Sequence, residues 1–183
     1  MDKYASRAGL KLEFALEKFK VNVSGLYVAD FGSSTGGFVD CLLQHGAAKV
    51  YSVDTSYGEL AWKLRNDPRV VVIERTNAMH VTLPEKVDFI SIDTGWTKQK
   101  LIIPNALANL KPDGTIISLI KPHYEAPREY LIKGKLMEEK IAEVLEFVKK
   151  DIEKLGVKII DIIESPIEGA KGKNKEYLAW ISK

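Results

Sequence analysis

Seven short apolar runs, each of strand length, recur along the 183 residues of this chain and are mostly separated by segments with helical periodicity. Apolar runs that alternate with amphipathic helices are typical of βαβ units, in which parallel strands are buried on both faces of one sheet. We therefore expect an α/β protein. Strands are predicted at residues 26–32, 48–56, 70–77, 87–95, 114–122, 157–166 and 176–182.

The segments between these runs predict helices and fix the direction of the last strand. In the longest helical segment, Leu136, Ile141, Leu145 and Val148 lie along one face. Only "IEGAKGKNK" separates the last two strands, which is too short for a crossover helix. The result is a seven-stranded, mostly parallel sheet with an antiparallel last strand. Helices are predicted near residues 6–19, 36–45, 58–66, 98–110 and 129–155.

Length and composition limit the class of protein. A chain of 183 residues fits one domain, here residues 1–183, that buries about 70% of its unfolded surface. Its apolar runs are far shorter than the roughly 18 residues needed to cross a bilayer, so we expect no membrane and a cytoplasmic location. Cys41 is the single cysteine and the histidines are scattered, so no metal is expected. A net charge of +2 does not identify a nucleic-acid partner.

Polar residues stand where the predicted parallel strands end. In an open α/β sheet, ligands bind beyond the carboxyl ends of the strands, near the point where the strand order reverses. We therefore expect the ligand site among these strand-end residues, which are Asp30, Asp54, Asn77, Asp93 and Lys121.

The glycine-rich stretch "ADFGSSTGGF" links the first strand to a helix. It lacks the lysine of a P-loop and the glycine spacing of a dinucleotide-binding turn, which disfavours a triphosphate and a nicotinamide cofactor. Asp30 suits a cationic amine, and the loop amides suit a carboxylate; together these are the amino-acid end of S-adenosylmethionine. Asp54 is placed for two ribose hydroxyls, and Asn77 either reads an adenine edge or is a turn residue.

The simpler interpretation of this loop is an ordinary strand-to-helix turn. On the cofactor interpretation, the residues predicted to bind S-adenosylmethionine are Asp30, Gly32, Ser33, Ser34, Thr35, Gly36, Gly37, Phe38, Asp54, Thr55, Asn77, Ala78 and Asp93.

Lys121 and Asp93 end strands that should flank this crevice. Such a pair is either a salt bridge or a pair of reacting groups, and the two roles are compatible. Lys11 on the first helix and Glu176 at the start of the last strand are, taken singly, ordinary surface charges.

Taken together, the motifs resemble a known family. The segments "SRAGLKL", "DFGSSTGGF", "VDTSYGELAWKLRNDPRV", "ERTNA", "LIKPHYEA" and "EYL" occur in the order found in hemolysin-A-type (TlyA) ribosomal RNA methyltransferases, relatives of the FtsJ ribose methyltransferases. The resemblance spans essentially the whole chain. It implies a Rossmann-like fold that uses S-adenosylmethionine, methylation of the ribose 2′-hydroxyl in ribosomal RNA, and a catalytic tetrad of Lys11, Asp93, Lys121 and Glu176.

These residue types suit that reaction. A ribose hydroxyl is a weak nucleophile at neutral pH, so we expect partial burial to lower the pKa of Lys121 and let it accept the hydroxyl proton. Asp93 and Glu176 are expected to position the two ammonium groups, and Lys11 to hold the ribose or its phosphate.

The chain departs from the family pattern in two places. The resemblance implies an amino-terminal RNA-binding module, and this chain begins at the methyltransferase helix, so RNA affinity is expected to be weak or to come from a partner protein or a second copy. In "IDTGW", Gly95 and Trp96 stand where the family has serine and phenylalanine; Trp96 either stacks on a base or packs the loop. The residues predicted to contact RNA are Arg7, Trp96, His123 and Lys173.

Two functional hypotheses remain. The first is a methyltransferase acting on ribose in RNA. The second is a non-catalytic protein that binds S-adenosylmethionine and RNA but has lost productive docking, and retention of all four tetrad residues argues against it. A membrane-acting hemolysin is disfavoured because the sequence has no spanning segment.

Overall fold

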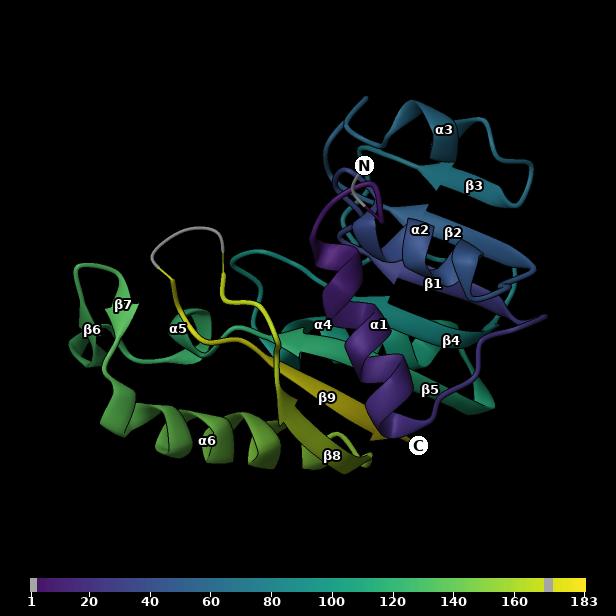
Figure 1. Ribbon diagram of the computed structural model, residues 1–183. Helices are drawn as coiled ribbons and strands as arrows, with labels where there is room; N and C mark the ends of the chain where they lie inside the picture. Colours follow the sequence, from purple (N-terminus) through teal and green to yellow (C-terminus); the bar gives the residue numbers. More distant parts are fainter. Residues whose placement is uncertain (1–2, 170–172) are drawn as a thin grey trace.

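One seven-stranded sheet runs through the molecule, and helices pack against both of its faces (Figure 1). The computed structural model describes residues 3–169 and 173–183. The strands follow one another in space in the order β3-β2-β1-β4-β5-β9-β8. They are β1 (Tyr27–Phe31), β2 (Lys49–Val53), β3 (Val70–Ile73), β4 (Val87–Ile92), β5 (Leu110–Ile120), β8 (Lys158–Glu164) and β9 (Tyr177–Ser182).

Strand directions confirm the predicted topology. The pairs from β3 to β5 are all parallel, whereas β9 runs antiparallel to β5 on one side and to β8 on the other. The strand order reverses at β1, which lies between β2 and β4. The carboxyl ends of β1 and β4 meet there, with Phe31 opposite Ile92, so the loops that follow both strands open at the same place.

Two apolar clusters, one on each face of the sheet, make the core. Phe89 and Ile90 are neighbours on β4 and point to opposite faces, as the period-two alternation of a strand requires. Helices α1 and α2 cover one face and α4 and α6 the other (Figure 1). The helices are α1 (Ala8–Phe19), α2 (Gly37–Gln44), α3 (Trp62–Arg65), α4 (Gln99–Asn109), α5 (Pro122–Glu125) and α6 (Ile141–Glu153).

The predicted helix at 129–155 is wrong in its first half. Residues 128–140 form two 3₁₀ turns (Arg128–Tyr130 and Glu138–Lys140) around a small hairpin of β6 (Leu131–Ile132) and β7 (Lys135–Leu136). Lys133 and Gly134 both have positive φ, as a two-residue hairpin turn requires, and a helix cannot continue through them. Leu136 therefore enters the core from the hairpin strand β7 and not from a helix.

Two other elements differ in length from the prediction. The helix expected at 58–66 shrinks to one turn at α3, and β5 begins at Leu110, before the expected residue 114. Pro112 and Asp113 are tolerated because they lie in the exposed first part of that strand.

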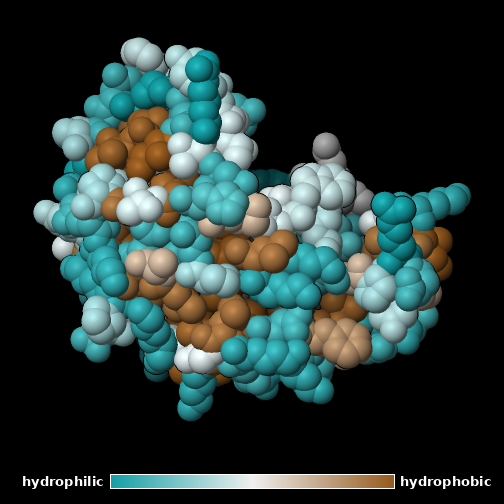
Figure 2. All heavy atoms as spheres, turned by 180° about the vertical axis from the view of Figure 1, so that it is seen from behind, coloured by the Kyte–Doolittle hydropathy of each residue, from teal (hydrophilic) through white to brown (hydrophobic). Residues whose placement is uncertain are grey.

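The face seen from behind carries several apolar patches separated by hydrophilic residues (Figure 2). Exposed apolar residues of the molecule include Leu101 on α4 and Phe147 on α6. Within residues 3–169 and 173–183, no helix combines the length and apolar character needed to span a membrane.

Candidate active site

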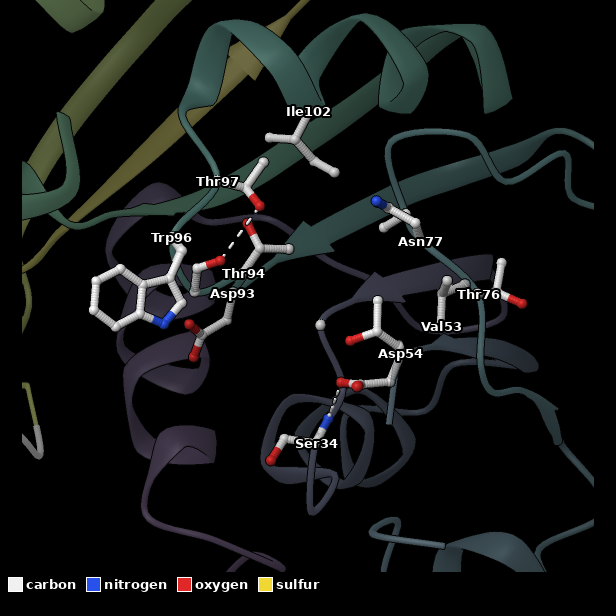
Figure 3. A pocket seen from close by; sticks show the side chains of 14 residues that line it. Ser34, Val53, Asp54, Thr76, Asn77, Asp93, Thr94, Trp96, Thr97 and Ile102 are labelled. Atoms are coloured by element: carbon white, nitrogen blue, oxygen red, sulfur yellow. Dashed lines mark hydrogen bonds between the residues drawn. The ribbon is translucent and has the colours of Figure 1, made fainter. Parts of the chain in front are cut away.

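A cavity of about 350 Å³ opens beyond the carboxyl ends of β1, β2 and β4, where the sequence predicted the ligand site (Figure 3). Most of its walls come from the segments that follow β1, β2, β3 and β4. Its lining residues are Gly32, Ser34, Val53, Asp54, Thr55, Thr76, Asn77, Ala78, Asp93, Thr94, Gly95, Trp96, Thr97 and Ile102.

The glycines of the loop after β1 allow close packing. Gly32 has φ +90°, and a Cβ atom there would collide with the carbonyl oxygen of Asp93. Gly36 has φ +97°, and a Cβ atom there would run into Leu60 and Leu64. Both positions combine a left-handed backbone with a crowded neighbour, so the loop holds this shape only with glycine.

Asp54 ties the loops after β1 and β2 together. Its Oδ2 accepts a hydrogen bond from the Ser34 amide at 2.7 Å, and its Oδ1 accepts one from the Ser56 amide at 2.7 Å (Figure 3). Each carboxylate oxygen has a second lone pair. The side chain is thus fixed by the backbone and still able to accept two ribose hydroxyl protons.

Asn77 has the turn role that the sequence left open. Its Oδ1 accepts a hydrogen bond from the Met79 amide at 2.9 Å, which closes a turn after β3. The same residue and Ala78 line the cavity, and Asn77 lies on the side opposite Asp93 (Figure 3). A turn role and a place at the cavity wall are therefore combined in one residue.

Asp30 lies beneath the loop and does not line the cavity. Its Oδ1 accepts a hydrogen bond from the Ser91 hydroxyl at 2.7 Å, and its Oδ2 has no hydrogen-bond partner among the described residues. Burial raises the pKa of this carboxyl to about 7. An unpartnered buried carboxylate oxygen suits a cationic ligand group.

A second cavity, of about 240 Å³, adjoins the first on the side of α1. It shares Gly32, Ser34 and Asp93 with the first cavity, so the two meet at the end of β4. Its other lining residues are Ser6, Ala8, Ser33, Gly37, Phe38 and Lys121. Thr35 lines neither cavity, and its carbonyl accepts a hydrogen bond from the Ala61 amide.

Lys121 and Asp93 form an ion pair at 2.5 Å where the cavities meet. Both side chains remain partly open, at 16% and 18% exposure. Burial alone lowers the pKa of Lys121, but the charge of Asp93 and its hydrogen bond outweigh this, and the pKa is raised. The expected lowering of this pKa is therefore wrong for this arrangement, because the carboxylate partner stabilises the ammonium form.

Lys11 and Glu176 form the other ion pair, which is closed to solvent. Their side chains are 7% and 4% exposed, and the residues come from α1 and from the segment just before β9. Ile120 is paired with Tyr177 in the sheet, which places Lys121 beside Glu176. The charge of Glu176 also contributes to the raised pKa of Lys121. The structure thus brings all four predicted tetrad residues together.

The four residues predicted to contact RNA do not all lie at the same cavity. Trp96 is 82% exposed and lines the first cavity, and His123 lies next to Tyr124, on which Trp96 stacks. Arg7 is exposed beside Ser6 and Ala8, whose side chains wall the second cavity. Lys173 lines a different cavity, near the hairpin.

Sequence reasoning missed several residues at the site, and three of them matter for the argument. Ser6 and Thr94 line the cavities, and Tyr124 packs against Trp96. The position of Tyr124, in the first turn after Lys121, was the one available signal for it.

The comparisons with known proteins agree with this geometry. Residues 4–183 match the FtsJ-like methyltransferase family. The chain belongs to this family. It is 37% identical over 185 residues to the 16S/23S rRNA (cytidine-2′-O)-methyltransferase TlyA of Mycobacterium tuberculosis, covering 97% of this chain and 68% of that protein. The chain thus spans about two thirds of the length of this relative.

Solved structures of other proteins superpose on this fold. A provisionally named hemolysin from Streptococcus thermophilus superposes with a TM-score of 0.95 at 38% identity, over 100% of this chain and 68% of that one. An S-adenosylmethionine-dependent methyltransferase from Listeria monocytogenes has a TM-score of 0.69 at 19% identity, over 97% and 99% of the two chains. The predicted Rossmann-like methyltransferase fold is confirmed.

As a methyltransferase of this family, the chain uses S-adenosylmethionine. The residues in the cavity and beneath its loop fit that molecule. Asp54 offers two acceptors to a ribose, the glycine loop leaves room for close approach, and the unpartnered oxygen of Asp30, below the loop, suits an amine.

Proposed function

We propose that this FtsJ-like methyltransferase transfers the methyl group to the 2′-hydroxyl of a ribose in ribosomal RNA. The observation that carries this proposal is the Lys121–Asp93 pair, placed where the two cavities meet and backed by Lys11–Glu176. The printed activity of the relative TlyA, methylation of a cytidine 2′-oxygen in 16S and 23S rRNA, supports the same reaction. No observation favours the binding-only alternative.

The first cavity would hold S-adenosylmethionine. Asp54 would bind its ribose, the amides of the loop 32–38 its carboxylate, Asp30 its amine, and Asn77 with Ala78 its adenine. When bound, the cofactor supplies a methyl group already activated on a sulfonium centre.

The second cavity would receive the target ribose. Because its pKa is raised, Lys121 is an ammonium at neutral pH and donates a hydrogen bond to the 2′-oxygen, stabilising the negative charge that develops there. The carboxylate of Asp93 accepts the hydroxyl proton, and water removes it afterwards. Positioned groups of this kind contribute about 10²- to 10⁴-fold to a rate. The Lys11–Glu176 pair holds α1 and the segment before β9 around this site.

RNA would approach across the rim of this cavity. Trp96 offers an exposed ring to a base, while Arg7, His123 and Lys173 are the remaining proposed contacts. We also propose that residues 1–183 act as one domain. An RNA-binding partner protein or a second copy of this chain would supply further RNA affinity. With ribosomal RNA as its substrate, the protein would act in the cytoplasm.

The direct test is to incubate the protein with methyl-labelled S-adenosylmethionine and ribosomal subunits and then hydrolyse the RNA with alkali. Labelled, alkali-resistant dinucleotides are expected, because a 2′-O-methyl group blocks cleavage at that linkage. Label on bases alone, or no label despite normal cofactor binding, would contradict the proposal. The matched control is Lys121→Met, which should bind the cofactor and leave no label.

A further inference from the structure

The short helix α5, which follows Lys121, contacts the loop that carries Trp96. The rings of Tyr124 and Trp96 are stacked, with centroids 4.6 Å apart and planes at 30°. The ring of His123 lies against Tyr124, at 4.1 Å between centroids. Three aromatic rings thus extend in a row from the strand end that bears Lys121 to the exposed rim of the cavity.

Trp96 is held in an unfavourable state on two counts. Its backbone has φ +62°, a left-handed conformation that is rare for a bulky side chain. Its side chain is 82% exposed, so burial in the core does not offset that strain. Strained residues of this kind persist where neighbouring structure holds them, and they cluster at functional sites.

The loop from Thr94 to Lys98 is held at one end by Lys121, which follows β5, and at the other end by Glu125, the last residue of α5. The Lys121 ammonium donates to the carbonyl of Thr94 at 3.5 Å. At the other end, the carboxylate of Glu125 accepts from the Gln99 amide at 2.7 Å, and the Lys98 ammonium donates to the Glu125 carbonyl at 3.3 Å. Trp96 stands at the middle of this loop, and the contact that orients its ring is the stack on Tyr124.

The position of the Trp96 ring indicates which ligand it contacts. The ring lies on the side of Asp93 away from Asp54 and Asn77, outside the part of the cavity proposed for the cofactor (Figure 3). Tyr124 contacts one side of the indole, and the high exposure of Trp96 leaves most of the ring open. A flat, open aromatic surface beside a ribose-methylating centre suits an unstacked nucleobase.

We propose that Tyr124 is a positioning residue that holds Trp96 as a preformed stacking platform for the base of the nucleotide whose ribose is methylated. This inference rests on the proposed function. Fixing the indole before RNA arrives removes part of the ordering cost of binding. Stacking tolerates any base, so the platform selects an unpaired or flipped-out nucleotide and not a particular sequence.

The test compares Tyr124→Leu with Tyr124→Phe, using ribosomal subunits as the methyl acceptor. Tyr124→Leu removes the ring, and KM for the subunits should rise about 2- to 10-fold, the range expected for a lost aromatic pair. Tyr124→Phe keeps the ring and should match the wild type. The affinity for S-adenosylmethionine should not change in either variant. The control for the Trp96→Ala variant used below is Trp62→Ala, because Trp62 is also highly exposed, at 77%, and lies on α3, away from the proposed RNA contacts.

A double-mutant cycle separates positioning from a general structural role. If Tyr124 acts through Trp96, then Trp96→Ala combined with Tyr124→Leu should be no worse than Trp96→Ala alone. Additive losses, or an equal loss in Tyr124→Phe, would overturn the inference. Tyr124→Met replaces the leucine variant if the latter does not fold.

A second measurement needs no RNA. In a background in which Trp62 and Trp180 are both replaced by phenylalanine, Trp96 is the single tryptophan. Time-resolved anisotropy should then show faster local motion of Trp96 after Tyr124→Leu, and unchanged motion overturns the inference. If the wild type labels no ribose while Trp96 is released by Tyr124→Leu, the proposed function fails and the holding role of Tyr124 stands.

Discussion

The two sides of the site, which meet at Asp93, consist of different kinds of chemical groups. The cofactor side consists of backbone amides, glycines with positive φ and a carboxylate, Asp54, held by the amides of Ser34 and Ser56. The catalytic side consists of charged side chains from distant segments, as in the Lys11–Glu176 pair, whose members are 165 residues apart.

The ion pairs of the catalytic side also differ from each other. Lys121–Asp93 stays partly open to the cavities, whereas Lys11–Glu176 is closed to solvent. An open pair can exchange its partner for a substrate oxygen; a closed pair mainly holds two segments together. Substitutions in the open pair, in the closed pair and on the cofactor side should therefore appear in different measurements. We expect the open pair to affect the rate of methyl transfer, the closed pair to affect the stability of the fold, and the cofactor side to affect the affinity for S-adenosylmethionine.

The largest effect is expected for Lys121→Met. Removing the ammonium should lower the rate of methyl transfer about 10²- to 10⁴-fold, because the developing charge on the 2′-oxygen loses its donor. Cofactor affinity, measured by calorimetry with S-adenosylhomocysteine, should stay within about twofold, since Lys121 lines the second cavity and not the first. Lys111→Met, at the other end of the sheet beside Asp88, is the matched control and should retain full activity. A variant that binds the cofactor and keeps its rate would remove Lys121 from the mechanism.

The next effect is on stability. Lys11→Met leaves the buried carboxylate of Glu176 without its partner. Breaking a buried ion pair in this way lowers the free energy of unfolding by about 3–5 kcal/mol. For a chain of this size the melting temperature should fall by about 10 °C. The double variant Lys11→Met with Glu176→Gln should recover most of that loss and remain poorly active. The control is Lys175→Met, whose partner Glu138 is exposed, and its melting temperature should match the wild type. An unchanged melting temperature in Lys11→Met would show that the pair has no structural role.

A smaller effect is expected on the cofactor side. Asp54→Asn replaces one of two acceptor oxygens with a donor that faces a backbone amide, and the affinity for S-adenosylmethionine should weaken about 10- to 100-fold. The rate at saturating cofactor should remain within about twofold of the wild type. A fall in the saturated rate with unchanged affinity would place Asp54 on the catalytic side and break the division.

The same division explains what the sequence could predict. The cofactor loop was readable because its determinants are local: Gly32 and Gly36 lie within one turn, and Asp54 ends the next strand. The seven strands and the antiparallel direction of β9 also followed from run lengths and loop lengths. Lys11 and Glu176 were paired only through the family resemblance, since nothing local connects α1 to the segment before β9.

Three features were beyond the sequence for physical reasons. The hairpin of β6 and β7 was hidden because its residues also satisfy a helical apolar period, and the turn at Lys133–Gly134 decided the outcome. The raised pKa of Lys121 depends on the balance between burial and a carboxylate 2.5 Å away, which no spacing reveals. The stack of Trp96 on Tyr124 requires the loop after β4 to fold back onto α5.

The smallest expected effect concerns the buried carboxyl of Asp30. Its pKa is raised to about 7 in the folded protein, above the usual value of 3.8, so the folded state holds a proton that the unfolded chain releases. This proton stabilises the cofactor-free protein at low pH, and the stabilisation is lost as pH rises through 7. Asp30→Asn should therefore raise the melting temperature more at pH 8 than at pH 5, measured by scanning calorimetry without cofactor.

Cofactor binding should show the opposite dependence on pH. An amine placed at the unpartnered oxygen favours the ionised carboxylate, so wild-type affinity for S-adenosylhomocysteine should tighten about tenfold from pH 6 to pH 8 and then level off. Asp30→Asn should bind more weakly and lose this dependence. Asp54→Asn is the control that weakens binding and keeps the pH dependence, because Asp30 is intact. If the wild type shows no change in affinity across pH 7, the cofactor amine does not reach Asp30, and this residue belongs to the loop's support and not to the cofactor side.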